Sequence, residues 1–231
     1  TFDMTGKWKI GRFSLALRER YQYTHFMPTE CQRVKYRGPV QAAGVSGELI
    51  EKGGYYFWPD DVTGMTCHCP QCRDLSASEQ SLLFENKMLA LLRQYDPEAT
   101  LAHIAYHQTL EAPLKVKASE GIFLEFAPIK RDYSKPLTTD EHKALADNLL
   151  AFPGYSHHVL EYWLDESMFS SWKRNALVEW PDNSERCASD INQYRHLGAT
   201  SITTFATWLN QAYINQYGST DDIFRHYGRS F

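Results

Sequence analysis

The stretch Gly121–Pro128 (GIFLEFAP) is apolar at nearly every position. A half-exposed strand alternates apolar and polar residues, so a short run without alternation indicates a strand that is buried on both faces. Similar runs occur before it at Leu101–Tyr106 and after it at His158–Leu164. Two more, Tyr55–Trp58 and Ser201–Trp208, extend the series in both directions. The sequence therefore predicts five buried strands.

Helix signals lie between most of these strands. Ser76–Glu79 is a capping-box signature, and an apolar stripe with helical spacing follows it. A second capping box at Thr138–Glu141 and a polar start at Asp182–Glu185 open two further predicted helices. A last helix is expected over about Leu209–Tyr217, after the fifth strand.

Strands that alternate with helices predict βαβ units and a mostly parallel sheet. A doubly wound sheet is the competing architecture, but it usually carries a Gly-rich phosphate turn, and no GxGxxG motif occurs. Polar and aromatic residues instead gather after the strands, where barrel enzymes keep their sites. We therefore predict an α/β fold, a (β/α)8 TIM-type barrel or the C-terminal part of one, over residues 55–231. Residues 1–54 are predicted to be an irregular segment that either precedes the barrel or forms part of it; within it, Phe13–Leu17 fits a strand or a short helix.

The bulk composition argues against several classes of protein. The chain has 231 residues, enough for one substantial domain, and a net charge of -4, which argues against a nucleic-acid binder. No apolar stretch approaches the ~18 residues of a membrane span. The chain starts at Thr1 without a signal-peptide pattern, which suggests a processed protein or a piece of a longer one with further domains.

Two pairs of neighbouring acids follow predicted strands. Asp60 and Asp61 follow the first, and Asp165 and Glu166 follow the fourth. Glycoside hydrolysis uses two carboxyl groups, one to protonate the leaving oxygen and one to support the developing charge or activate a nucleophile. Neighbouring carboxylates also raise one another's pKa, which keeps an acid protonated near neutral pH. These four residues are the candidate catalytic groups; the alternative is that they cap helices or carry surface charge.

Aromatic and polar residues near the strand ends form a candidate glycan-binding set. A sugar ring packs its apolar face on an aromatic ring, and Trp208 is the strongest platform candidate. Arg131 is expected either to bind substrate or to pair with Asp132, and the aromatic residues alternatively pack inside the barrel. The predicted substrate-binding residues are Tyr106, His107, Arg131, Tyr133, Trp163, Trp208 and Asn210.

The segment Cys67–Cys72 (CHCPQC) places three thiols within six residues. Thiolates at this spacing can hold a structural zinc ion, with a fourth ligand from elsewhere, for which Cys31, His103 and His107 are the options. A local disulfide and buried free thiols are the alternatives. No cofactor is expected to take part in catalysis, and the serine-elbow, zincin and Walker motifs do not occur.

Several segments of the chain resemble the domain of unknown function 4838. They are Trp58–Asp61 with Cys67–Cys72, then Ala105–Thr109, Ile129–Leu137 and Gly198–Thr203. That family is typical of bacterial glycan-utilisation proteins. Some of its members form glycoside hydrolase family 163, which acts on N-glycans as an endo-β-N-acetylglucosaminidase.

The resemblance spans roughly residues 55–231 and implies a full barrel in which Tyr55–Trp58 is the fourth strand. In barrels that cleave hexosaminides, the acetamido group of the substrate attacks, one carboxylate orients it and the next protonates the leaving group. By that analogy Asp60 orients and Asp61 donates the proton, although such pairs usually end in Glu.

The implied activity is that of a retaining, substrate-assisted glycoside hydrolase that acts on N-acetylglucosamine-containing glycans in the periplasm or at the cell surface. Two alternatives stay open. One is a non-catalytic carbohydrate-binding protein with a degenerate glycosidase barrel, and the other is a metal-stabilised protein unrelated to sugars.

Overall fold

The structure is a computed structural model that describes residues 5–10, 13–18, 23–25, 35–37, 54–59, 64, 66–137, 139–152, 157–181 and 183–229. Its strands are β1 (Thr5–Ile10), β2 (Phe13–Arg18), β3 (Tyr23–His25), β4 (Lys35–Arg37), β5 (Gly54–Tyr56), β6 (Trp58–Pro59), β7 (Thr100–Tyr106), β8 (Ile122–Ala127), β9 (His157–Glu161) and β10 (Ser201–Thr204). Its helices are α1 (Ala77–Leu92), the 3-10 turn η1 (His107–Thr109), α2 (Thr139–Ala151), α3 (Glu166–Phe169), α4 (Ser184–His196), α5 (Gln211–Tyr217) and α6 (Asp221–Arg229).

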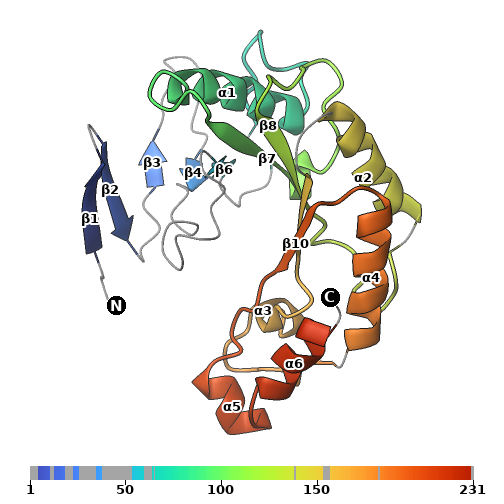
Figure 1. Ribbon diagram of the computed structural model, residues 1–231. Coiled ribbons are helices and arrows are strands. Elements are labelled where there is room, and N and C mark those ends of the chain that lie inside the picture. Colours follow the sequence, from blue (N-terminus) through green and yellow to red (C-terminus); the bar gives the residue numbers. More distant parts are fainter. Residues whose placement is uncertain are drawn as a thin grey trace.

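The central feature is a curled sheet of five strands in the order β10-β9-β8-β7-β5. All four strand pairs are parallel, and each strand lies beside its neighbour in the chain among these five. A doubly wound sheet reverses its strand order at a switch point, and this sheet has no such reversal. The helices α1, α2 and α4 lie along its convex side (Figure 1). The predicted α/β class is therefore confirmed, in the form of a parallel half-barrel.

Strand register decides which side chains face the helices and which face the concave side. His103 in β7 hydrogen-bonds Ser78 of α1, so it points toward the helices. Its neighbour Ile104 points the opposite way, because successive residues of a strand alternate between faces. Ile104 pairs with Glu125 of β8, and Glu125 pairs with His158 of β9. These three side chains therefore share the concave face.

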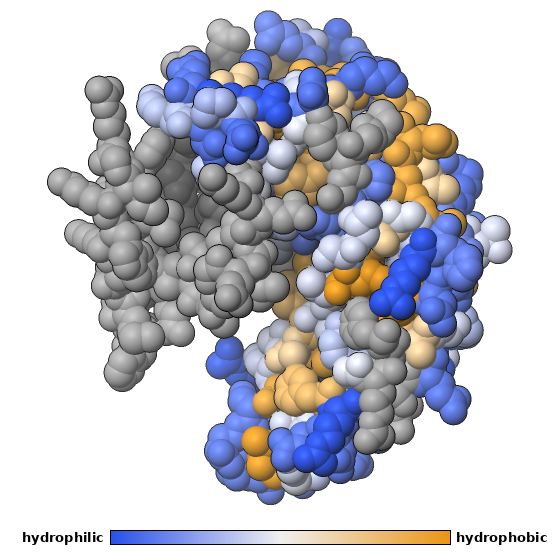
Figure 2. Space-filling model, viewed as in Figure 1, coloured by the Kyte–Doolittle hydropathy of each residue, from blue (hydrophilic) through white to orange (hydrophobic). Residues whose placement is uncertain are grey.

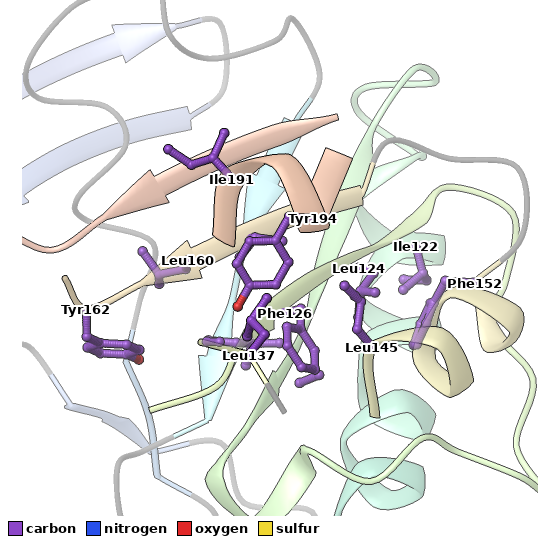
Figure 3. Close-up of a cluster of buried hydrophobic side chains, with 14 of the residues drawn as sticks. Ile122, Leu124, Phe126, Leu137, Leu145, Phe152, Leu160, Tyr162, Ile191 and Tyr194 are labelled. Atoms are coloured by element: carbon purple, nitrogen blue, oxygen red, sulfur yellow. The ribbon is translucent and has the colours of Figure 1, made fainter. Parts of the chain in front are cut away.

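The main apolar core lies between the sheet and the convex-side helices. Ile122, Leu124 and Phe126 of β8 are fully buried there, together with Leu145 of α2 and the adjacent Phe152 (Figure 3). Burying a large apolar side chain contributes about 1.5–3 kcal/mol, so this layer holds the helices on the sheet. The concave face is left to a different set of residues.

Most predicted elements are found. The capping box of α1 forms, because Ser76 Oγ accepts from Glu79 N at 3.1 Å and Glu79 Oε2 accepts from Ser76 N at 2.9 Å. The helices α2, α4 and α5 correspond to the helices predicted after Thr138, after Asp182 and over Leu209–Tyr217. The predicted fifth strand ends early, at Thr204, and Trp208, within the predicted range, adopts a left-handed backbone that a strand does not use. The last helix, α6, was not predicted.

Antiparallel pairs precede the half-barrel. β1 pairs with β2, which makes Phe13–Leu17 part of a strand rather than a helix. β3, β4 and β6 form a second small sheet. The predicted strand Tyr55–Trp58 is divided, because Tyr55 pairs within the parallel sheet while Trp58 pairs with Arg37 of β4. Among the described helices, none has the length and apolar character needed to span a membrane.

Candidate functional site

Glu125 is a candidate functional residue that the sequence prediction missed. It lies in the middle of β8, points to the concave face and is only 6% exposed. Burial raises the pKa of its carboxyl group to about 8, because the charged form loses its hydration. Near neutral pH Glu125 therefore holds a proton, which is the state that a general acid requires.

The carboxyl group of Glu125 is incompletely paired. Its Oε2 atom is buried and has no hydrogen-bond partner among the described residues. Burial is the larger effect on the pKa of Glu125, and the Trp58 indole lowers this pKa by a smaller amount. The Trp58 indole therefore lies close to the Glu125 carboxyl group. Trp58 Nε1 nevertheless forms no hydrogen bond of normal geometry in the described part of the chain. Buried polar atoms are almost always paired, and the Trp58 indole acts on the Glu125 pKa as a hydrogen-bond donor, so the two groups face each other short of normal hydrogen-bond geometry.

Aromatic rings cover the concave face beside Glu125. Phe123 packs edge-on against Tyr56, with ring centroids 5.4 Å apart, and lies 5.0 Å from the His158 ring. The Tyr56 hydroxyl and His158 Nδ1 share a hydrogen bond of 3.1 Å. These rings, from β5, β8 and β9, form a packed aromatic floor beside Glu125, in which Phe123 is buried and Tyr56 and His158 are half-buried.

Two phenols lie toward the carboxyl ends of the strands. Tyr106 ends β7 and Tyr162 follows β9. Burial raises the pKa of Tyr162, and the charges of Tyr106, Glu161, Glu125 and Asp165 add to the shift, so each of these groups lies within electrostatic reach of Tyr162. Tyr162 therefore keeps its proton at any physiological pH and can donate a hydrogen bond. The two phenols thus lie toward the edge where barrel enzymes keep their sites, and the protonated carboxyl group of Glu125 lies further inside the sheet on the same face.

The predicted acids Asp165 and Glu166 lie at the start of α3, after β9 has ended at Glu161, and are both buried. Asp165 accepts a hydrogen bond from Ser167 within the first turn of α3. Glu166 Oε1 accepts from the backbone N of Val178 at 2.7 Å, and burial raises the pKa of this carboxyl group. Glu166 therefore holds the loop that contains Val178 in place. Of these two acids, Asp165 is the one whose charge raises the pKa of Tyr162. Asp60 and Asp61 lie outside the described residues.

Arg131 lies in a buried charge cluster on the helix side of the sheet. Its guanidinium group contacts Asp190 of α4 and lies 3.3 Å from Glu161 of β9. The expected pairing with Asp132 is not what the structure shows, because Asp132 binds Lys135 Nζ at 2.8 Å. All three members of the cluster have almost no exposed side-chain surface, so their charges depend on one another.

Tyr133 and Trp163 complete this helix-side cluster. The Tyr133 hydroxyl donates to Glu161 Oε2 at 3.0 Å, and Trp163 Nε1 donates to Asp190 Oδ2 at 3.2 Å. Trp163 is fully buried and Tyr133 nearly so. The structure therefore places Arg131, Tyr133 and Trp163 on the side of the sheet opposite Glu125, and we leave them out of the candidate site.

The remaining predicted binding residues lie in the loops after the strands. Trp208 is half-buried, and the guanidinium carbon of Arg174 lies 5.3 Å from its ring centroid. Asn210 is exposed and caps α5, since its Oδ1 accepts from Ala212 N at 2.9 Å. His107 follows β7 with a backbone φ of 50°. Tyr106 lies on the concave face of β7, two residues beyond Ile104, which is the strand-register partner of Glu125.

A second candidate site is the cysteine cluster ahead of α1. The Sγ atoms of Cys67, Cys69 and Cys72 all lie within 4.8 Å of one another, so the cluster could hold a metal ion. In a tetrahedral zinc site with bonds of ~2.3 Å, sulfur atoms lie about 3.8 Å apart, which fits this spacing. A hydrogen bond from Cys67 lowers the pKa of Cys69 to about 7, while burial raises that of Cys72 to about 11.

The side chain of Gln80, in α1, organises the cysteine loop. Its Oε1 accepts from Cys67 N at 2.7 Å, and its Nε2 donates to the carbonyl oxygens of Cys67, Cys72 and Leu75. One amide therefore fixes both ends of the loop before any metal binds.

A tetrahedral zinc site would need a fourth ligand beside the three cysteines, and the contacts narrow the three expected candidates. His103 is excluded, because both of its ring nitrogens are engaged, with Ser78 and Glu85. Cys31 lies outside the described residues, and His107 remains an option.

The raised pKa of Glu125 predicts a specific pH dependence of stability. The unfolded chain ionises this group near its ordinary value of 4.5, whereas the folded chain keeps it protonated to about 8. The stability associated with Glu125 is therefore fully present below pH 4.5 and is lost as pH rises to about 8. Relative to wild type, Glu125→Gln should gain roughly 4 kcal/mol of unfolding free energy between these pH values. Urea unfolding at pH 4.5, 6 and 8 measures this, and parallel pH curves for both proteins would contradict it.

These features define an α/β protein with a parallel, curled sheet and a protonated carboxyl group on its concave face. Residues 59–219 match the family model described as domain of unknown function (DUF4838), and the chain belongs to this family. Comparisons with curated proteins and with solved structures gave no match.

Proposed function

We propose that the chain is a glycoside hydrolase with Glu125 as its proton donor, acting on N-acetylglucosamine-containing glycans. The observation that carries the proposal is the buried, protonated carboxyl group of Glu125 on the concave face of the parallel sheet. The aromatic floor lies on its amino-terminal side, and Tyr106 and Tyr162 lie toward the carboxyl ends of the strands. Glycosidases keep such an acid beside the scissile bond. The described sheet is then half of a (β/α)8 barrel, whose open edges at β5 and β10 are joined by further strands.

The proposed chemistry is retaining and substrate-assisted. The acetamido oxygen of the substrate attacks the anomeric carbon, the glycosidic bond breaks, and the proton of Glu125 moves to the leaving oxygen. Water then opens the cyclic intermediate and returns a proton to Glu125. Tyr106 and Tyr162 supply phenol donors to the substrate. Glu125 thus takes the acid role that the resemblance implied for Asp61, while Asp60 and Asp61 stay candidates for orienting the acetamido group.

A glycan-panel digestion tests this proposal. The protein should release reducing ends from N-glycans or N-acetylglucosamine oligosaccharides, with the anomeric configuration of the first product retained by NMR. Binding of the same glycans without any release would contradict hydrolysis and support the alternative, a non-catalytic carbohydrate-binding protein. The bonds that Asp165 and Glu166 make within the fold are the observation in favour of that alternative.

We also propose that Cys67, Cys69 and Cys72 hold a structural zinc ion. Three preorganised thiols with fitting spacing support this, and the ion would tie the loop after β6 to α1. It takes no part in the proposed hydrolysis.

Metal analysis of the purified protein should find about one zinc per chain. Cys69→Ser should lose the metal and melt roughly 5 °C or more lower, whereas a Cys187→Ser control, far along the chain in α4, should keep it. Wild-type protein without zinc, or with two cysteines oxidised in a thiol titration, would contradict the proposal and indicate a local disulfide.

A further inference from the structure

Strained backbone is concentrated in the loops that follow the parallel strands. In the described part of the chain, the non-glycine residues with positive φ are His107, Ser171, Trp172 and Trp208, at 50°, 53°, 58° and 63°. They follow β7, β9 and β10 in the chain. A left-handed backbone costs about 1–3 kcal/mol for such residues and persists mainly at functional sites. Two of the four are tryptophans.

These two tryptophans do not serve the apolar core. Trp172 is 64% exposed, and Trp208 is half-buried without packing in either buried cluster. Trp163 and Trp180 behave differently, since both lie in the cores. Over the region of α3, α5 and α6, apolar residues lie beside strongly hydrophilic ones (Figures 1 and 2). A large exposed ring held at a strained backbone, as Trp172 is, is costly unless a ligand covers it.

Positive charge lies over the Trp208 ring and next to Trp172 in the chain. Arg174 stacks on Trp208, and Lys173 precedes it. Both side chains are exposed, and neither forms an ion pair within the residues that the structure describes. A guanidinium group stacked on an indole keeps its N–H edges free for a planar anion such as a carboxylate.

The two loops are fixed to each other and to the candidate site. Glu166 N donates to the Thr207 carbonyl at 3.2 Å, which joins the loop after β10 to the start of α3. Phe205, three residues before Trp208, packs its ring 5.3 Å from that of Tyr162. Tyr162 in turn lies within electrostatic reach of Glu125. The loops that carry Trp172 and Trp208 are therefore connected, through Phe205 and Tyr162, to the surroundings of Glu125.

We propose that Trp172, Lys173, Arg174 and Trp208 form a subsite for an acidic sugar, one that carries a carboxylate or sulfate group. The indoles pack the apolar face of the sugar ring, and Arg174 binds the anion with Lys173 beside it. The choice of a sugar as ligand rests on the proposed glycosidase function. The choice of an acidic one rests on the unpaired cations.

Binding of matched neutral, carboxylated and sulfated oligosaccharides to the full chain tests the subsite. Calorimetry should show that wild type prefers an acidic ligand about tenfold or more over its neutral counterpart, the value of one charge-assisted hydrogen bond. The preference should shrink as salt increases. The carboxylated and sulfated ligands show which anion the site accepts.

Two variants and a control make the assignment specific. Arg174→Gln should abolish the preference but keep neutral-glycan binding within about twofold, while Trp208→Ala should weaken both. Lys87→Gln, which removes one exposed charge from α1, should match wild type. Equal binding of acidic and neutral ligands by wild type, or an intact preference in Arg174→Gln, would overturn the subsite. If the protein hydrolyses glycans but binds acidic and neutral ones equally, the subsite is wrong and the proposed glycosidase function stands. If it prefers acidic glycans but hydrolyses none, the glycosidase function is wrong and the subsite stands.

Discussion

Glu125→Gln should lower the turnover of an N-acetylglucosamine-containing glycan by ~10²–10⁴-fold, the usual contribution of a general acid. Glutamine matches glutamate in size and fits the same buried position, but its amide cannot donate a proton to the leaving oxygen. The Michaelis constant should change little, because the aromatic floor and the phenols remain. Steady-state kinetics on an N-glycan measure both quantities.

The leaving group and the pH profile show whether Glu125 acts as an acid. A nitrophenyl leaving group needs no proton, so Glu125→Gln should lose far less activity on a nitrophenyl glycoside than on a natural glycan. In wild type, kcat/KM should fall above about pH 8 as Glu125 ionises, and this fall should vanish in the variant.

Glu120→Gln is the matched control, since Glu120 is exposed and lies just ahead of β8. It should leave turnover unchanged. Wild-type turnover by Glu125→Gln would exclude Glu125 as the acid and return the role to Asp61.

Arg131→Leu should lower the unfolding free energy by about 3–5 kcal/mol. Arg131 lies between Glu161 and Asp190, whose side chains are fully buried, and its removal leaves both carboxylates without a countercharge. Urea denaturation at neutral pH measures the loss.

Arg225→Leu provides the comparison. Arg225 makes an ion pair of 3.3 Å with Asp222, but both side chains are largely exposed to water. Water already screens such a pair, so its loss should cost ~1 kcal/mol or less. Equal effects of the two substitutions would show that the buried cluster is not held by its charges.

The sequence could have pointed to Glu125. It is the one acid inside the apolar run Gly121–Pro128, and alternation along a strand places it on the same face as Phe123. The prediction instead favoured acids that follow strands, and the two of them that the structure describes bind within the fold, Asp165 to Ser167 and Glu166 to the backbone of Val178. An isolated acid in an apolar strand is the signal that was passed over.

By itself the sequence determined the elements and their order. Capping boxes, apolar runs and helical stripes act within a few residues, so α1 and β8 could be read from the chain. The tertiary structure alone decided which strand face is concave, that Trp58 lies near Glu125, and that Arg131 pairs with Asp190. Those partners are separated by 67 and 59 residues in the chain, and no local pattern encodes such contacts. The pKa of Glu125 follows from the same cause, because burial depends on the whole fold and not on neighbours in sequence.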